Sequence, residues 1–393
     1  MPLTKVQLKT PHLVLYIESD MGIVFNQIKQ SLYQLSAISI SILLSIDEGL
    51  TKKQVFHQVA NLSQLDEKEI DDSYAEVSLL FSQDKGQSSY DDGIYPEILT
   101  VKKTSSVTCP NSRTVQIADA TFSIFIDSSD LFFDLSILLT PCEKHLLSVD
   151  FQLKIYPNAT DETLFDISCN DLVVENNLPY NHVVPHLIDR LQILSYQSTD
   201  YMFCFHGAAL ESEYGCLLLP GVSGAGKSTL SCALANKQYS LYSDEMIVLD
   251  KFFNVLTLNL PIAIKSGSWS TIALEYPHLS QEKVWQREDG RLLKYIWPKQ
   301  FVKAKKYTSN KTMLINPCFQ KGHVDVAEQV VKLSLFETIQ LITDGGYQIS
   351  SELTVDKVEQ LFSFISASQN YKLSYNSTAN ALMQLEILWY CNQ

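Results

Sequence analysis

Residues 221–228 have the composition of a phosphate-binding loop. They read Gly-Val-Ser-Gly-Ala-Gly-Lys-Ser, a complete G-x-x-x-x-G-K-S/T pattern. The glycines allow successive backbone N–H groups to surround an oxyanion, and the positive end of a following helix would stabilise it. In such a loop Lys227 reaches the terminal phosphates of a nucleotide and Ser228 places its hydroxyl on Mg²⁺. The nucleotide-binding residues predicted in this way are Gly221, Val222, Ser223, Gly224, Ala225, Gly226, Lys227, Ser228 and Thr229.

Two adjacent carboxylates follow this loop. Asp244 and Glu245 end the segment Leu-Tyr-Ser-Asp-Glu at residues 241–245. A carboxylate on a strand beside a phosphate loop can hold Mg²⁺ or accept a proton from an attacking hydroxyl, and two of them can divide those tasks. The alternative is a pair of solvated acids near a strand end.

His206 and Lys265 are two further candidates. His206 lies in the apolar segment 203–209, just before the strand that leads into the loop, and Lys265 closes the apolar run that begins at residue 260. A lone His is usually structural, and a Lys can simply mark the end of a strand. Both residues are therefore candidates for the site, and a purely structural role is the alternative for each.

The segment 265–311 is locally basic. It contains ten Lys and Arg residues against four acids, a balance of +6 within a chain whose net charge is −14. Such a segment can be a solvated face, or a rim whose field attracts a nucleotide or an acidic substrate. In the second case Lys265, Arg287 and Arg291 are candidates for contact with substrate or phosphate.

The composition excludes several other classes of protein. The 393 residues are 46% apolar and 19% charged, which is typical of globular domains. The net negative charge is poorly suited to non-specific nucleic-acid binding, which depends on phosphate neutralisation. No apolar run approaches the roughly 18 residues of a membrane span, and the first residues have no signal-peptide pattern. We therefore expect a cytoplasmic protein with no nucleic-acid or membrane partner.

The elements around the loop follow an α/β order. Residues 215–220 form an apolar strand, residues 228–238 have helical composition, and residues 241–249 read as a second strand. This alternation predicts a parallel α/β layer that places the loop between a strand and a helix. A last helix is expected at residues 378–390.

The first 80 residues predict a small winged-helix-like module. Two short strands are expected at residues 9–17 and 22–27, and apolar residues recur at helical spacing from 35 to 46. Thr51, with Gln54 three residues later, has the pattern of a capping box. A third helix is predicted from residue 66 to 81.

The chain is accordingly divided into four segments. The polar, Gly- and Asp-containing stretch after residue 82 reads as a linker, and the segment beyond it is rich in strands, expected at residues 115–126, 147–156 and 164–174, before a helix at 182–196. The predicted segments are a winged-helix-like domain at 1–85, a linker at 86–98, a strand-rich lead-in at 99–200 and an α/β core at 201–393.

Residues 110–393 resemble the HPr kinase/phosphorylase-like family, in particular its HPr-kinase-related branch. The resemblance depends on four ordered motifs, which are His206-Gly, the loop 221–229, Ser-Asp-Glu at 243–245 and Pro-Ile-Ala-Ile-Lys-Ser-Gly-Ser at 261–268. It implies an HPr-kinase-like P-loop kinase core that uses ATP or GTP with Mg²⁺.

The resemblance also implies a role for each motif residue. Lys227 and Ser228 would bind phosphate and Mg²⁺, Asp244 would be the base, Glu245 its neighbour at the metal, and His206 a helper near the γ-phosphate. The second acid is Glu245 where the HPr-specific enzymes carry Asp, and their Gly- and Arg-rich downstream segment is not found. These departures argue against HPr as the substrate. HPr kinases form oligomers, so a homo-oligomer is left open.

Residues 1–85 resemble, more weakly, the PqqD-like peptide-recognition domains. The similarity is carried by the segment 24–35, which leads to Ile-Asp-Glu-Gly-Leu-Thr at 46–51. Such domains bind the leader of a ribosomally made peptide by adding it as a strand to their sheet. A peptide or small-protein substrate bound through the N-terminal domain is therefore implied.

Together these features predict a kinase that phosphorylates a Ser/Thr hydroxyl of a peptide, plausibly the precursor of a ribosomally synthesised natural product. A linked recognition domain would raise the effective substrate concentration at the active site. Two alternatives stay open at this point. One is a kinase for a free small molecule such as an amino acid, and the other is a non-catalytic, nucleotide-dependent protein that presents a peptide.

Overall fold

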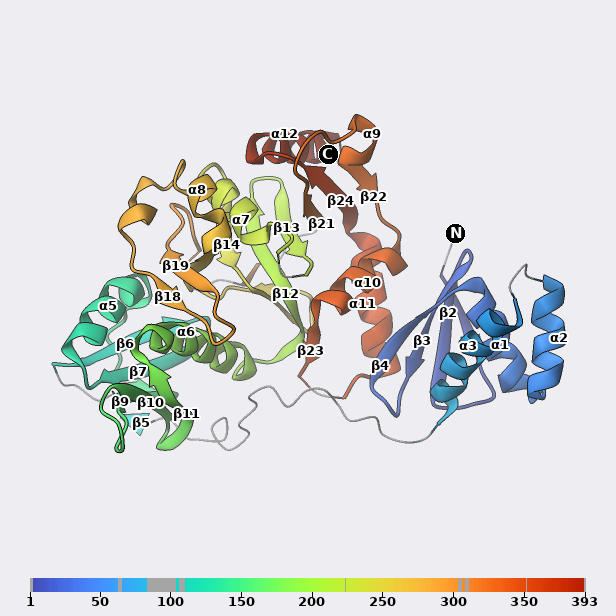
Figure 1. The fold of residues 1–393 in the computed structure, drawn as a ribbon, viewed down its shortest axis with the longest axis horizontal. Coiled ribbons are helices and arrows are strands. Elements are labelled where there is room, and N and C mark those ends of the chain that lie inside the picture. Colours follow the sequence, from blue (N-terminus) through green and yellow to red (C-terminus); the bar gives the residue numbers. More distant parts are fainter. Residues whose placement is uncertain are drawn as a thin grey trace. The chain divides into compact units, whose positions relative to one another are not determined.

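The computed structural model has a mixed α/β fold with several sheets, which confirms the α/β class (Figure 1). It describes residues 3–62, 66–82, 104–105, 110–222, 224–302, 306–307, 311–350 and 352–391. The predicted linker at 86–98 lies outside these residues. In the described part of the chain, no helix has the length and apolar character needed to cross a membrane.

The chain divides into two compact units, and each draws on segments that are distant in sequence. The first unit comprises Met1–Gly93, Leu333–Gln340 and Ser351–Ala367. The second unit comprises Ile94–Lys332, Leu341–Ser350 and Ser368–Gln393.

The first unit contains a four-stranded antiparallel sheet followed by helices. Its strands, in the spatial order β1-β2-β3-β4, are β1 (Thr4–Gln7), β2 (Leu13–Glu18), β3 (Met21–Asn26) and β4 (Ser31–Leu35). The sequence predicted only two strands here. β1 and β4 were missed because they are edge strands whose residues are mostly exposed or half-buried, so they lack a clear apolar alternation.

Three helices cover one face of this sheet. They are α1 (Ala37–Glu48), α2 (Lys52–Leu62) and α3 (Glu67–Ser78), close to the predicted positions. Leu15 and Val24 of the sheet share a core with Ile42 of α1, Val55 of α2 and Ile70 of α3. The alternating residues of each strand point to opposite faces, so the second face of the sheet requires a separate cover.

α11 (Val355–Ala367) covers the second face, although it comes from the last tenth of the chain. The ring of Phe362 meets the ring of Tyr16 edge to face, with 5.0 Å between their centroids. The Glu359 carboxylate accepts hydrogen bonds from Lys5 Nζ at 2.6 Å and from the Tyr16 hydroxyl at 3.2 Å. This helix was predicted to be part of the segment 201–393, but it contacts the N-terminal sheet.

The second unit begins with a five-stranded sheet in the order β11-β10-β9-β7-β6. Its strands are β6 (Ser112–Ile117), β7 (Ala120–Ile126), β9 (Phe151–Pro157), β10 (Leu164–Cys169) and β11 (Leu172–Pro179), with β5 (Thr104–Ser105) paired to β8 (Ser148–Val149). The single strands predicted at 115–126 and 164–174 are hairpins, because Ala118 in one turn and Asn170 in the other adopt positive φ.

Two helices complete this part of the unit. They are α5 (Ser129–Leu139), which the sequence analysis left unassigned, and α6 (Tyr180–Gln197), which spans the helix expected at 182–196. Leu131 and Leu135 of α5 share one buried cluster with Leu187 and Leu191 of α6. That cluster also contains Tyr295, so the lead-in and the basic segment have a common core.

A ten-stranded sheet forms the centre of the second unit, in the order β20-β16-β15-β12-β13-β21-β24-β22, with β14 and β23 also paired to β12. The strands are β12 (Tyr201–Ser212), β13 (Gly215–Pro220), β14 (Ser240–Ser243), β15 (Met246–Asp250), β16 (Val255–Leu256), β20 (Lys306–Tyr307), β21 (Thr312–Phe319), β22 (Val330–Lys332), β23 (Tyr347–Ile349) and β24 (Gln369–Tyr375). Only β13, β21 and β24 pair in parallel, whereas β12 is antiparallel to each of its partners. The expected parallel layer is therefore a mixed sheet.

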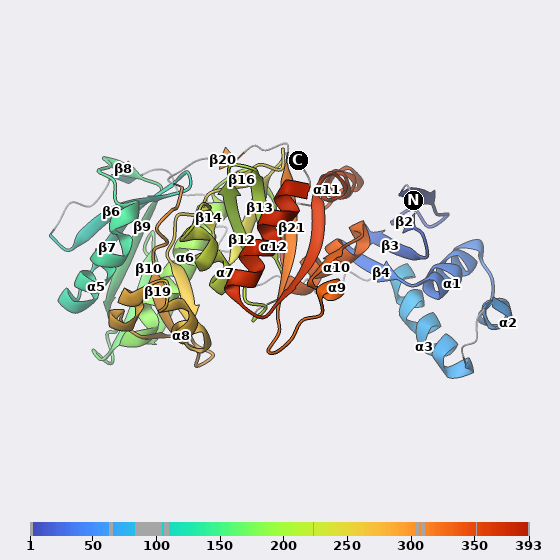
Figure 2. The ribbon, with the colours of Figure 1, turned by 90° about the horizontal axis from the view of Figure 1, so that it is seen from above.

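The remaining elements surround this sheet. α7 (Lys227–Ala235) and α12 (Thr378–Cys391) lie side by side over it and share a core with β13 and β21 (Figure 2). A three-stranded sheet holds much of the basic segment, with β17 (Ile262–Lys265), β18 (Trp285–Gln286) and β19 (Leu292–Ile296) in the order β17-β19-β18. The other α-helices are α8 (Trp269–Ile272) and α9 (Val326–Gln329) of this unit, and α10 (Leu335–Gly345), whose residues are divided between the two units.

Candidate active site

The glycine-rich loop connects the end of β13 to the first residue of α7. Gly221, Gly224 and Gly226 have φ values of 142°, 90° and 92°, which residues with a Cβ rarely adopt. A Cβ on Gly226 would also lie 2.6 Å from the Tyr375 hydroxyl at the end of β24. The predicted loop residue Ser223 lies outside the described residues. The chain therefore needs glycine at these positions to make this turn and to begin α7.

Lys227 is folded back into the loop that precedes it. Its Nζ donates hydrogen bonds to the carbonyl oxygens of Gly221 at 2.7 Å and Val222 at 2.8 Å, and the residue is 6% exposed. Burial lowers the pKa of Lys227 to about 8, although the carboxylates of Asp244 and Glu245 favour its charged form. The ammonium is thus held at the loop in a weakly solvated position.

The acid pair occupies the break between β14 and β15, where the sequence analysis expected a continuous strand. The Ser228 hydroxyl donates to Asp244 Oδ2 at 2.9 Å, which joins the start of α7 to the end of β14. Burial, and then the neighbouring charge of Glu245, raise the pKa of Asp244 to about 7. Glu245 has a φ of 75°, a left-handed conformation at the interruption between β14 and β15.

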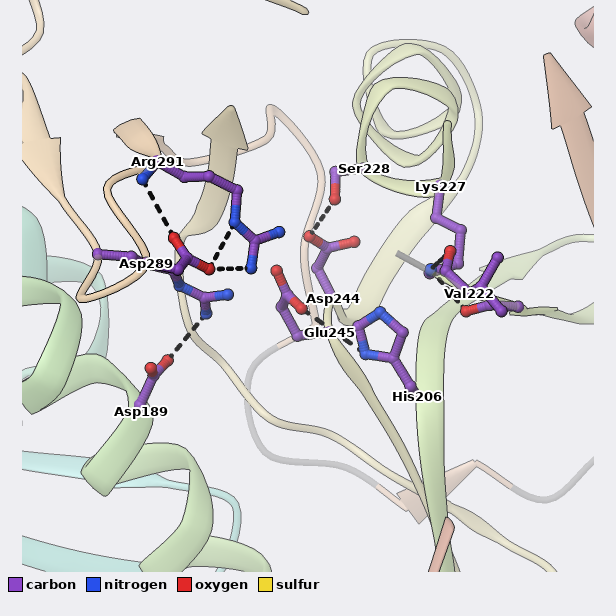
Figure 3. A network of polar contacts seen from close by, with 11 residues as sticks. Asp189, His206, Val222, Lys227, Ser228, Asp244, Glu245, Asp289 and Arg291 are labelled. Carbon is purple, nitrogen blue, oxygen red and sulfur yellow. Dashed lines mark hydrogen bonds and ion pairs between the residues drawn. The ribbon is translucent and has the colours of Figure 1, made fainter. Parts of the chain in front are cut away.

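Glu245 also pairs with His206. His206 Nδ1 lies 3.7 Å from Glu245 Oε2, and the Glu245 carbonyl accepts a bond from the Gly207 N–H at 2.9 Å. Burial lowers the pKa of His206, and the positive charge of Lys227 adds to this effect. Among the described residues, Glu245 Oε1 is buried without a hydrogen-bond partner. Sequence motifs almost 40 residues apart therefore meet at one corner (Figure 3).

These groups line one open cleft. Lys265 lies at the cleft, as do Thr229 and Ser268, whose hydroxyls are 3.0 Å apart. The cleft is lined by His206, Gly224, Gly226, Lys227, Ser228, Thr229, Glu245, Ala263, Ile264, Lys265 and Ser268. The cleft thus brings five of the predicted loop residues together with His206, Glu245 and Lys265, and Asp244 joins them through Ser228.

Arg287 and Arg291 lie beside this cleft, each with an acidic partner. Arg287 Nη2 is 3.2 Å from Asp189 Oδ1 of α6, and Arg291 Nε donates to Asp289 Oδ2 at 2.7 Å. Figure 3 shows the Arg291 guanidinium turned toward Asp244 and Glu245. The Glu245 charge raises the pKa of both guanidinium groups, although Asp189 and Asp289 contribute more. The two arginines are therefore part of a charge network, not of a simple solvated face.

Some residues of the site gave no signal in the sequence. Asp189 is one acid on an amphipathic helix, and Tyr375 and Tyr295 are aromatic residues in strands, which usually indicate only a core. Their places depend on the packing of α6, β24 and β19 around the loop. Gly346 was also missed, although its carbonyl accepts the His206 backbone N–H at 3.1 Å.

The oxygen atoms at the corner fit a hard cation such as Mg²⁺. Ser228 and Asp244 already face each other, and Glu245 offers an unpartnered buried oxygen. Within the described residues, no group of three or more His, Cys, Asp or Glu could hold a metal by itself. Mg²⁺ usually takes one or two carboxylates and completes its shell with water and substrate phosphates, so a Mg²⁺ ion at this corner would need both.

No family model matches the chain, and no curated protein has significant sequence similarity to it.

Proposed function

We propose that the protein is a phosphotransferase that moves the γ-phosphoryl group of ATP or GTP to a Ser/Thr hydroxyl of a peptide. One observation carries the proposal. The glycine-rich loop, its buried Lys227 and the Ser228–Asp244 contact converge on one cleft with Glu245 and His206. On this proposal the part of the second unit that begins at residue 201 provides a P-loop kinase core of the HPr-kinase type, and the lead-in packs beside it.

The loop would bind the nucleotide phosphates. The backbone N–H groups at the start of α7 and the Lys227 ammonium would surround them, and phosphate oxygens would replace the carbonyl partners that Lys227 has now. Ser228 and Glu245 would hold Mg²⁺, which would neutralise charge on the β- and γ-phosphates.

Asp244 would act as the base. Its pKa of about 7 is close to neutrality, which suits a group that must accept a proton and yet be ionised beforehand. The acceptor oxygen forms its bond to the γ-phosphorus as the bond to the bridging oxygen breaks and the nucleoside diphosphate leaves. The hydroxyl proton goes to Asp244. His206, kept uncharged by burial and by Lys227, would stabilise the γ-phosphate as a hydrogen-bond donor.

The first unit would recognise the substrate as a PqqD-like, winged-helix domain. Both faces of its sheet are packed, one against α1–α3 and the other against α11. Among the described strands, the edge strand β4 is paired with β3 alone, so a peptide strand could be added there. Deleting residues 1–85 would expose Phe362 on α11, so the intact chain is the better material for any test.

The experiment is transfer of γ-labelled phosphate from ATP and Mg²⁺ into a size-fractionated extract of the source cells. Lys227→Ala removes the buried ammonium at the loop. Lys237→Ala is the matched control, because Lys237 is an exposed Lys near the end of the same helix.

Label in a peptide or small-protein fraction that disappears with Lys227→Ala and persists with Lys237→Ala supports the proposal. Label confined to metabolites would favour a small-molecule kinase. No Lys227-dependent label, with peptide binding retained, would instead favour a nucleotide-dependent presenter.

A further inference from the structure

The cleft has a second wall that carries its own lysine. This wall is formed by Ala263, Ile264, Lys265 and Ser268, at the end of β17 and in the turn that follows it. Lys265 is half-buried and is the last residue of the strand. The cleft is therefore lined by two lysines that come from different elements, Lys227 from the start of α7 and Lys265 from the end of β17.

The turn that carries Lys265 is held at both of its ends. Trp269 Nε1 donates to the Ile264 carbonyl at 2.9 Å, which closes the turn around Lys265. The Ser268 hydroxyl lies 3.0 Å from the Thr229 hydroxyl, which ties the turn to the helix that begins with the phosphate-binding Lys. The backbone of Lys265 is thus fixed in place beside the glycine-rich loop.

The charge of Lys265 reaches the groups that would surround a γ-phosphate. Burial is the main cause of the pKa shifts of His206, Lys227 and Asp244, and the Lys265 charge acts on all three by lowering the pKa. His206 and Lys227 also line the same cleft as Lys265. An oxyanion bound among these groups would therefore be attracted by Lys265 as well.

The chemistry of the two lysines defines the ligand. A Lys ammonium has three N–H donors and no acceptor, so its natural partner is an oxyanion. Two ammonium groups in one cleft repel each other, and with Mg²⁺ in place the positive charge would exceed that of the carboxylates of Asp244 and Glu245. A nucleoside triphosphate supplies the missing negative charge. Its γ-phosphate has three terminal oxygens, so a cation on the second wall can contact one that the loop does not hold.

We propose that Lys265 is a second cationic ligand of the nucleotide's γ-phosphate, through which the cleft distinguishes a nucleoside triphosphate from a diphosphate. The proposal rests on the proposed kinase function and deepens it, because a cation on the transferred group would stabilise the charge that develops there during transfer. Ser268 and Trp269 are then positioning residues, which act through Lys265.

Four variants test this assignment. Lys265→Met removes the ammonium and keeps much of the apolar stem, whereas Lys265→Arg keeps the charge. Trp269→Phe keeps an aromatic ring and removes only the N–H that closes the turn. Lys299→Met is the matched control, because Lys299 is an exposed Lys of the same basic segment and does not line the cleft.

The experiment measures binding without turnover. The full-length chain is titrated, in the presence of Mg²⁺, with ADP and with a non-hydrolysable ATP analogue (AMP-PNP), and binding is followed by calorimetry. We expect wild type to bind AMP-PNP more tightly than ADP. Lys265→Met should weaken AMP-PNP binding roughly ten- to hundredfold, the size of one lost hydrogen bond to a charged group, and leave ADP binding nearly unchanged.

The other variants should follow the same selectivity. Lys265→Arg should retain most of the preference for AMP-PNP, and Trp269→Phe should lose part of it, whereas Lys299→Met should bind both nucleotides as wild type does. Thermal melts show whether each variant is folded. If Lys265→Met is not folded, Lys265→Gln takes its place.

The proposal is overturned if wild type binds the two nucleotides alike, or if loss of the Lys265 charge weakens both equally or neither. Unchanged nucleotide binding with impaired phosphate transfer would assign Lys265 to the acceptor instead. Because no transfer is measured in the titrations, the expected binding pattern would survive a failure of the kinase proposal. Labelled peptide together with an unchanged preference for AMP-PNP in Lys265→Met would refute the role of Lys265 alone.

Discussion

Helix ends in the first unit follow the local conformational preferences of their residues, whereas the acid corner in the second unit departs from them. Asp66 and Glu69 form a complete capping box at the start of α3, and Gly49 ends α1 in the left-handed conformation that glycine favours. At the corner, Glu245 adopts a similar left-handed conformation without being glycine, and Lys227 is buried.

The difference indicates where the chain tolerates unfavourable states. At the corner, a non-glycine residue at positive φ, a carboxyl with a pKa near 7 and an unpartnered carboxylate oxygen each cost free energy, and all belong to the adjacent residues Asp244 and Glu245. The first unit also has residues at positive φ, Ser19 and Gln30, but these lie in the hairpin turns between β2, β3 and β4, beside regular helix caps and a closed apolar core. Proteins generally depart from local rules at functional sites, so this contrast supports the choice of site.

Asp244→Asn should give the largest change. If Asp244 is the base, phosphate transfer falls about 10²- to 10⁴-fold. In wild type, kcat/KM should be bell-shaped, with an acid limb near pH 7 from Asp244 and an alkaline limb near pH 8 from Lys227. The variant should lack the acid limb. An unchanged profile would remove Asp244 from the mechanism.

Relative to wild type, Asp244→Asn should gain stability at alkaline pH. The folded Asp244 carboxyl holds its proton up to about pH 7, whereas the unfolded one releases it at the usual lower pH, so wild-type stability falls as pH rises between these two values. Asn has no such titration. Thermal melts at pH 5 and pH 8 would check this: the gain at pH 8 should exceed any at pH 5.

Phe362→Ala should produce the next largest effect, confined to the first unit. Removing this ring from the face of Tyr16 should cost about 3–5 kcal/mol of unfolding free energy. All four Trp residues belong to the second unit, so their fluorescence reports that unit alone. Amide exchange in β2 and β3 should accelerate.

Phe252→Ala is the control for this change, because Phe252 is 72% exposed and lies in the second unit. It should leave exchange in the first unit unaltered. If Phe362→Ala does the same, α11 is not the cover of the N-terminal sheet.

Glu245→Gly should change the free energy of unfolding by less than Phe362→Ala does, and in the opposite direction. Glycine adopts positive φ without penalty, so relief of this strain should add up to about 1 kcal/mol. Loss of the carboxylate should still reduce phosphate transfer. Ser19→Gly, at φ 59° in the turn before β3, is the matched change in the first unit. Ser19→Gly should give a similar gain in stability and leave phosphate transfer unchanged. A loss of phosphate transfer in this variant would contradict the contrast between the first unit and the acid corner.

Asp66→Ala tests the regular helix cap of α3 in the first unit. Loss of the capping box should cost about 1 kcal/mol in chemical denaturation of the first unit and leave kcat unaltered. Asp72→Ala, an exposed change within the same helix, should cost less. Equal effects of the two substitutions would show that the cap contributes little.

Elements governed by neighbours in sequence could be predicted closely. The strand at 215–220 and the helix ends at Thr51 and Asp66 agree with the structure, because their apolar runs and caps depend on contacts a few residues away. β1 and β4 could not be found, since an edge strand is defined by its partner more than by its own composition.

For the site, the sequence determined the residue types: the glycine-rich loop, Lys227, Ser228, the acid pair and His206. Only the tertiary structure decided that Ser228 meets Asp244, that Glu245 meets His206, and that Arg287 is held by Asp189 from a helix nearly 100 residues away. It likewise placed α11 on the N-terminal sheet. Such contacts depend on how distant elements pack, and a local pattern of residue types carries no record of that packing.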